Sequence, residues 1–169
     1  MQVKVINLSK NPLPKYETDK AAGLDVRADL SRFTPQNLPK LFGDCELIYE
    51  GNGHPKAMVR LGVGSRILVP TGLKVAIPEG YEIKVRPRSG LALKKGITVL
   101  NTPGCVDSDF RGEIGVILIN HGTEPFWFED GERIAQFTLE KVEHIDWEEV
   151  TELDTTSRNS EGFGTTGVK

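Results

Sequence analysis

The stretch from Val99 to Glu113 contains the side chains of this chain that are best suited to chemistry. Within it, Asp107 offers a carboxylate that can orient a water molecule, and the nearby Phe110 ring offers an apolar face for a planar ligand. The breaker sequence Asn-Thr-Pro-Gly separates two β-rich runs, 96–100 and 113–120, so we expect a hairpin with a ligand-binding turn at its tip. An Asx-turn in an ordinary hairpin would explain Asp107 without any function.

A second candidate site is an anion seat at residues 86–92, Arg-Pro-Arg-Ser-Gly-Leu-Ala. The pattern predicts a short helix over 89–95, with Ser89 as its N-cap and Gly96 closing it. A helix start presents unpaired N–H groups, and Arg88 adds a positive charge beside them. The alternative is that Ser89 is only a cap and that the arginines are surface charges.

The C-terminal residues 158–167 form a third candidate, Arg-Asn-Ser-Glu-Gly-Phe-Gly-Thr-Thr-Gly. The glycines allow backbone N–H groups to approach phosphate oxygens, Arg158 can form a forked contact with them, and Phe163 offers a face for a base. The segment lacks the Gly-x-x-x-x-Gly-Lys-Ser/Thr order of a Walker loop. A flexible low-complexity end explains the same composition.

Two further polar groups are placed to support such sites. Asp25 follows a glycine-containing turn at the head of a predicted strand, where it could orient an arginine or a metal-bound water. Arg133 and Gln136 flank an apolar pair within 131–137. We interpret Arg133 as a partner in an ion pair or a sheet-edge contact, and leave Gln136 open.

The elements that must position these residues are strands. The chain has 169 residues, about one domain, with 18 glycines and 10 prolines among short Val/Ile/Leu runs, which indicates an all-β fold. We expect a hairpin over 75–85 and a surface insertion at about 30–58. The acidic run 140–154 should begin as a last strand and become a connector, and the tail 155–169 should be mobile.

Charge and composition exclude several classes of function. A net charge of −3 argues against a general grip on nucleic acid. No run approaches the roughly 20 apolar residues that span a membrane, and the start lacks a signal-peptide pattern, so we expect a cytoplasmic protein. Cys45 and Cys105 form no CxxC pair, so we expect free thiols.

Five segments, in their order along the chain, resemble the motifs of the dUTP pyrophosphatase (dUTPase) family of homotrimeric β-proteins. They are Ala22–Asp25, Pro87–Ala92, Asn101–Gly112, Gly131–Gln136 and Arg158–Gly167. The resemblance covers the chain apart from the insertion. It implies a distorted jelly-roll β-barrel over 1–154, and a tail over 155–169 that closes an active site shared between copies.

The resemblance also implies roles for the residues of the third motif. Asp107 would activate the attacking water, Asn101 would read the edge of uracil, and Phe110, a tyrosine in many members, would lie under the deoxyribose. Backbone groups reading the base would belong to Gly104, Cys105 and Val106.

The phosphates of the substrate would be bound from two parts of the chain. The contacts from the body would come from Arg88, Ser89, Gly90 and Gln136. The contacts from the tail would come from Arg158, Ser160, Gly164 and Thr165, with Phe163 stacking on the base. Asp25 would act indirectly, through Mg²⁺-bound water or an arginine.

The expected activity is therefore hydrolysis of dUTP to dUMP and pyrophosphate with Mg²⁺, by attack at the α-phosphorus. This reaction keeps uracil out of DNA and supplies dUMP for thymidylate synthesis. One alternative is a dCTP deaminase, but Ile117 occupies the position of that family's proton-transferring glutamate. Another alternative is a non-catalytic nucleotide sensor with the same fold.

Overall fold

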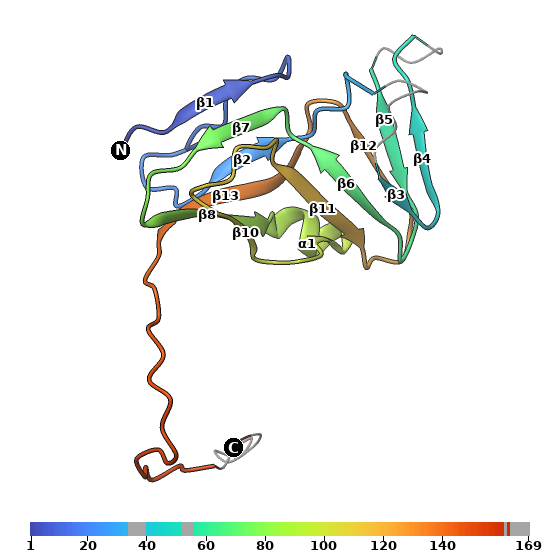
Figure 1. Cartoon of the computed structure of the whole chain (residues 1–169). Helices are drawn as coiled ribbons and strands as arrows, with labels where there is room; N and C mark the ends of the chain where they lie inside the picture. Colours follow the sequence, from blue (N-terminus) through green and yellow to red (C-terminus); the bar gives the residue numbers. More distant parts are fainter. Residues whose placement is uncertain (34–39, 52–55, 161, 163–169) are drawn as a thin grey trace.

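The structure is a computed structural model that describes residues 1–33, 40–51, 56–160 and 162. Its described part contains one short helix among strands, which confirms the expected all-β class (Figure 1). The elements are β1 (Lys4–Asn7), β2 (Leu24–Arg27), β3 (Leu41–Phe42), β4 (Cys45–Ile48), β5 (Met58–Leu61), β6 (Arg66–Pro70), β7 (Leu73–Ala76), β8 (Tyr81–Pro87), α1 (Ser89–Lys95), β9 (Ile97–Val99), β10 (Gly104–Val106), β11 (Gly115–Asn120), β12 (Phe126–Glu129) and β13 (Arg133–Lys141). No helix in the described ranges is long and apolar enough to cross a membrane.

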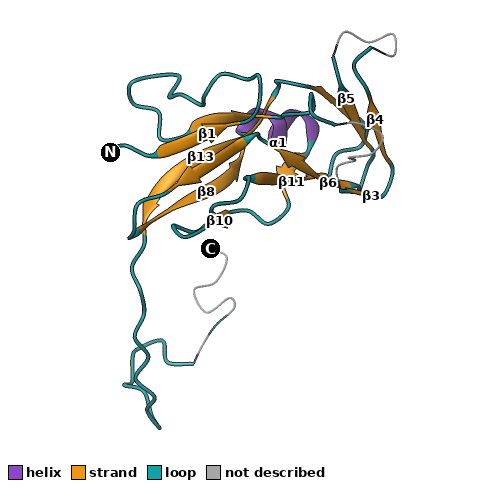
Figure 2. Ribbon diagram, turned by 45° about the horizontal axis from the view of Figure 1, so that its top comes forward, coloured by secondary structure: helices purple, strands orange, loops and turns teal. Residues whose placement is uncertain are grey.

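The strands form four sheets, which are not closed into a barrel within the described part of the chain (Figure 2). The sheet orders are β10-β8-β13-β2, β3-β6-β11-β9, β12-β5-β4 and β1-β7. The core lies between the sheets because their strands alternate buried apolar positions with more exposed ones, as in β6, where Ile67 and Val69 are buried and Arg66 and Leu68 are not. Val69, Leu118 and Phe128 are among its completely or almost completely buried side chains.

Two expected hairpins differ from the structure in instructive ways. The prediction of a hairpin over 75–85 was wrong. A turn is present, in which the Tyr81 N–H donates to the Pro78 carbonyl at 3.2 Å. The strands on its two sides do not pair with each other, however, because β7 pairs with β1 and β8 pairs with β10 and β13. Strands β9 and β11 do pair antiparallel, as expected. The connection from β9 to β11 is not a tight turn, however, because it includes β10, which belongs to a different sheet.

Helix α1 begins at Ser89 and ends at Lys95, as predicted. Gly96 closes it in the left-handed conformation at φ 68°, where a side chain would be strained. The N-cap prediction was wrong, because Arg88 occupies the cap position and no side chain caps the helix. Ser89 is instead the first helical residue.

The described parts of the region 30–58, which we expected as a surface insertion, pair with other strands and contribute to the core. Strands β3 and β4 pair with β6 and β5, and Leu30 and Ala57 are buried in the core. At the other end of the chain, β13 finishes at Lys141, so the run 140–154 begins in the last strand, as expected, with only its first two residues. The described residues from 143 onward are exposed and run away from the body as an extended segment (Figure 1).

Candidate functional site

The Asp25 carboxylate is the centre of a polar cluster at one end of the β10-β8-β13-β2 sheet. Gln136 lies opposite both Asp25 on β2 and Arg86 on β8, so the register brings the second and fourth motifs to the first. Asp25 Oδ1 accepts a hydrogen bond from Gln136 Nε2 at 2.9 Å. Its Oδ2 lies 3.2 Å from Arg133 Nη1 and 3.3 Å from Arg88 Nη2. We call Asp25, Arg88, Arg133 and Gln136 the arginine cluster.

The arginine cluster combines two guanidinium groups with one nearly buried carboxylate, and Glu17 Oε1 lies 3.5 Å from Arg133 Nη1. The Asp25 side chain is 8% exposed, whereas the Arg88 and Arg133 side chains are 28% and 39% exposed. Arg88 is also fixed through Nη1, which donates to the Arg133 carbonyl at 3.0 Å. Asp25 therefore orients both guanidinium groups while leaving part of each accessible to a ligand.

The same contacts test whether Asp25 suits a divalent metal ion. Both of its oxygens already accept N–H groups, two of them from cations, which repel Mg²⁺. Across the described residues, no group of three or more His, Cys, Asp or Glu side chains could hold a metal ion. The arginine cluster does not fit a protein-bound Mg²⁺ site.

The start of α1 adds open backbone beside Arg88. Ser89 and Gly90 are exposed, and a Cβ placed on Gly90 would meet nothing within 4 Å. Each of the first helical N–H groups lacks a partner within the helix, so this surface suits an anion. The arginine cluster and the helix start thus lie together, as the motif analysis expected.

Asp107 lies at the end of β10, on a turn that it shares with Phe110. The Phe110 N–H donates to the Asp107 carbonyl at 3.2 Å, and Arg111 Nη1 donates to the Ser108 carbonyl at 2.6 Å. The Asp107 side chain is exposed, and in the described part of the chain its carboxylate has no hydrogen-bond or ion-pair partner. A carboxylate left free in this way can accept a proton from a water molecule.

A cavity of about 190 Å³ opens at this turn. Asp107, Phe110 and Glu113 contribute to its lining. The outer end of the Phe110 ring lies against Gly112, where an added Cβ would lie 2.5 Å from its Cζ atom, so a side chain there would displace the ring. Glu113 was not among the expected site residues.

Asn101 and the residues of β10, which we expected to bind the nucleobase, lie directly before this turn. The Asn101 amide lies over Gly104, where an added Cβ would be 3.1 Å from Asn101 Nδ2. Cys105 is an exposed free thiol, and hydrogen bonding to Glu82 raises its pKa. Gly104 and Val106 are buried, which fixes the backbone that a ligand would meet.

Within one chain, the Asp107 turn and the arginine cluster lie far apart. Val106 pairs with Ile83, so Asp107 continues opposite Glu82, whereas Asp25 is level with Arg86, four residues further along β8. Asp25 also lies three strands across the sheet from β10. At about 3.3 Å per residue and 4.8 Å per strand, the separation is about 20 Å.

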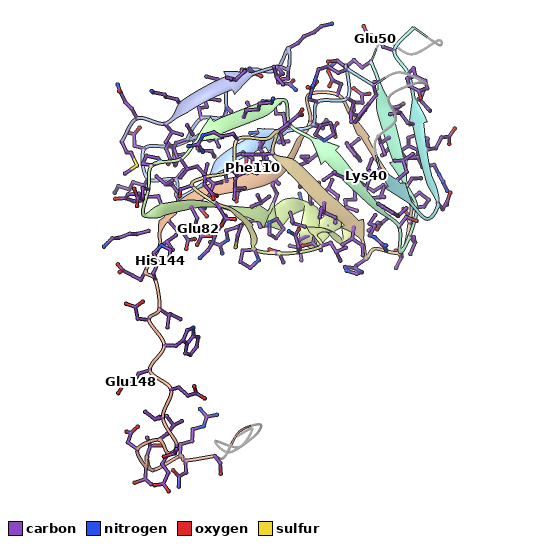
Figure 3. All side chains as sticks on the ribbon, viewed as in Figure 1. Lys40, Glu50, Glu82, Phe110, His144 and Glu148 are labelled. Carbon is purple, nitrogen blue, oxygen red and sulfur yellow. The ribbon has the colours of Figure 1, made fainter. Side chains whose placement is uncertain are left out.

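The tail residues lie away from both groups. Figure 3 shows His144 where the extended segment leaves the body, and Glu148 further along the segment, away from Phe110. Arg158 and Ser160 are exposed near the far end of this segment. Phe163, Gly164 and Thr165 lie outside the described residues.

Comparisons with known proteins agree with the geometry. The dUTPase family model matches residues 56–167. A deoxyuridine 5′-triphosphate nucleotidohydrolase of Fusobacterium nucleatum is 52% identical over 167 residues, covering 99% of this chain and 97% of that protein. The protein of the same name from Finegoldia magna is 44% identical, covering 99% of each chain.

Solved structures show the same fold. A mutant dUTPase of Staphylococcus bacteriophage 80alpha with dUpNHpp matches with a TM-score of 0.74 at 20% identity, covering 99% of both chains. A mutant dUTPase of phage phi11 of S. aureus, described with a structural Mg(II) ion, matches with a TM-score of 0.67 at 16% identity, over 92% of this chain and all of that one.

Proposed function

Because this chain belongs to the dUTPase family, we propose that it hydrolyses dUTP to dUMP and pyrophosphate. Relatives that match almost its whole length are named deoxyuridine triphosphate nucleotidohydrolases, which supports this activity. In a cell the reaction would keep uracil out of DNA and supply dUMP for thymidylate synthesis.

The observation that carries the proposal is the unpartnered Asp107 carboxylate in a cavity shared with Phe110. Asp107 accepts a proton from a water molecule and orients it toward the α-phosphorus. The exposed half of the Phe110 ring packs under the deoxyribose, where a 2′-hydroxyl would collide with it. The Asn101 amide and the backbone of Gly104, Cys105 and Val106 bind the uracil edge.

The arginine cluster and the helix start bind the triphosphate, which carries about four negative charges and repels a nucleophile until they are offset. Arg88, Ser89, Gly90 and Gln136 make these contacts. Asp25 acts through the arginines, since its own oxygens are engaged by them and by Gln136.

The active site is shared between copies of the chain in a homotrimer. Its support is the separation of about 20 Å between Asp107 and Asp25 along and across the sheet. A site that takes the two groups from different copies would not have to span this separation. The extended segment after β13 is long enough to carry the fifth motif to another copy, where Arg158, Ser160, Phe163, Gly164 and Thr165 close over the nucleotide.

Mg²⁺ would be bound by the triphosphate, because the arginine cluster does not fit it and Mg²⁺ commonly binds substrate phosphates. When bound there, it would reduce the negative charge on the phosphates. The chain's own contributions remain binding, orientation and the proton accepted by Asp107.

The test compares pyrophosphate release from dUTP, dTTP, dCTP and UTP by the intact protein. We expect a strong preference for dUTP, and a loss of about 10²–10⁴-fold in kcat for Asp107→Asn. In ¹⁸O-labelled water the label should enter dUMP, whereas label found only in pyrophosphate would contradict attack at the α-phosphorus. Ammonia release from dCTP, or dUTP binding without cleavage, would replace the proposal with a deaminase or a sensor.

A further inference from the structure

Glu113 lines the cavity at the Asp107 turn and is also tied to a buried charge elsewhere in the fold. Its Oε1 atom accepts a hydrogen bond from the Gly72 N–H at 2.9 Å and forms an ion pair with Arg32 Nη2. Arg32 Nε in turn donates to Asp29, whose side chain is completely buried. The Ser31 hydroxyl donates to the other Asp29 oxygen at 3.0 Å.

This chain of contacts joins the loop after β2 to the last residue of the catalytic turn. We propose that Glu113, held by Arg32 and the Gly72 N–H, is a positioning residue that sets the geometry of Asp107 and Phe110. The kinetic part of this inference rests on the proposed function, whereas the structural part does not.

The hydrogen bonds on either side of the turn explain why Glu113 matters. Upstream, β10 is fixed by its pairing with β8, and downstream, the Ile114 N–H donates to the Leu73 carbonyl at 2.9 Å. Within the described structure, the hydrogen bonds that residues 107–112 donate are local, from the Phe110 N–H and from Arg111. Glu113 is therefore the side chain that ties the downstream end of the turn to the body.

The fit around Gly72 supports the same conclusion. Gly72 has φ 72°, and a Cβ added there would lie 2.8 Å from Asp29 Oδ2 and 2.6 Å from Ser9 Cβ. Glycine thus lets the β6–β7 turn approach Asp29 while its N–H points at Glu113. The Glu113 side chain is 24% exposed and the Arg32 side chain 37%, so the pair is only partly screened by solvent.

The removal of Glu113 leaves the Gly72 N–H without its acceptor and frees the end of the turn. Because a displacement of about 1 Å at reacting groups can cost about 10²-fold in rate, we expect Glu113→Ala to lower kcat about 10–100-fold with a much smaller change in KM. Glu113→Gln keeps an oxygen for the Gly72 N–H, and should recover part of that loss.

The experiment compares Glu113→Ala, Arg32→Ala and the double variant, with Glu79→Ala, an exposed glutamate on the β7–β8 turn, as the matched control. Two readouts are taken: kcat and KM on dUTP, and hydrogen–deuterium exchange of the peptide covering 107–114. We expect the 107–114 peptide to exchange faster than wild type in both single variants and at the wild-type rate in the control. The double variant should lose no more kcat than Glu113→Ala.

A wild-type kcat and a wild-type exchange rate in Glu113→Ala would overturn the inference. So would a double variant whose fold-loss in kcat equals the product of the two single losses, because such a result shows that Glu113 and Arg32 act independently. If Glu113→Ala does not fold, the same two readouts on Glu113→Gln decide, with unchanged values overturning it. The exchange readout needs no turnover. A wild-type protein that fails to cleave dUTP would therefore refute the proposed function and still test the positioning role.

Discussion

Mixing two inactive variants tests whether Asp107 and the arginine cluster act together only across copies of the chain. Asp107→Asn removes the group that we propose activates water, and Arg88→Ala removes a cation that we propose binds phosphate and that lies 3.3 Å from Asp25. Each variant alone should be nearly inactive. In a site built within one chain, every copy in a mixture would still lack one of the two residues.

The size of the expected recovery follows from the separation of about 20 Å between Asp25 and Asp107 in a single chain. If Asp107 comes from one copy and Arg88 from another, each site draws its two residues independently. In trimers formed at random from equal amounts, about one quarter of the sites combine an intact Asp107 with an intact Arg88. The mixture should recover about one quarter of wild-type activity.

The assay denatures the two variants together, refolds them, and measures pyrophosphate release from dUTP. The two variants refolded separately and mixed only afterwards are the control, which shows how much exchange occurs without refolding. A co-refolded mixture that is no more active than the sum of its parts would refute the shared site. Wild-type protein is taken through the same procedure, and its return to full activity would exclude a failure of refolding as the cause.

Three further changes probe the arginine cluster, the sheet and the tail. Asp25→Asn removes the carboxylate that Arg88 and Arg133 share, leaving Arg133 only its longer contact with Glu17. It should cost about 2 kcal/mol, or about 4–8 °C in Tm, with a raised KM for dUTP. The exposed Asp19→Asn is the control, and an effect on Mg²⁺ requirement alone would contradict the arginine role. Hydrogen bonding to Lys84 lowers the pKa of Glu140, so this pair stabilises the fold above the ordinary glutamate value of 4.5 and ceases to do so as pH falls through the lowered pKa. Glu140→Gln should therefore flatten the loss of stability as pH falls below about 4.5 in urea titrations; an unchanged slope would argue against the pair. Removal of residues 156–169 should leave Tm within about 2 °C but abolish most activity, since the described residues of this segment are exposed; full activity would count against the lid.

Local signals in the sequence predicted elements better than their partners. Helix α1 could be bounded because Gly96 has the left-handed conformation that ends a helix, which is a property of a few residues. The pairing of β7 could not be predicted, because alternation of apolar residues is equally consistent with pairing to β8 or to β1. Ser89 was misplaced by one position for a similar reason, since a serine suits both the cap and the first turn.

The site could be predicted where a motif keeps its residues together and not where contacts cross the fold. Asp107 and Phe110 are close in sequence and share one cavity. Arg32 and Glu113, which form an ion pair, are 81 positions apart in the sequence, so no local sequence pattern predicts their contact. Similarly, Asp25 was expected to meet either an arginine or a metal-bound water, and only the register of β2 with β13 shows it beside Arg133 and Gln136.

The path of β10 links the fold to the proposal of a site shared between copies. If 101–112 formed a tight hairpin between β9 and β11, Asp107 would stay with the β3-β6-β11-β9 sheet. Instead β10 joins the edge of the other sheet, running antiparallel to β8, and carries Asp107 toward the end where β8 begins, while Arg88 lies beyond the end where β8 finishes. The two halves of the chemistry are thus held at opposite ends of one strand by backbone hydrogen bonds. A change of side-chain rotamer cannot bring the two ends of β8 together, so the proposed shared site predicts that an isolated copy of the chain is inactive.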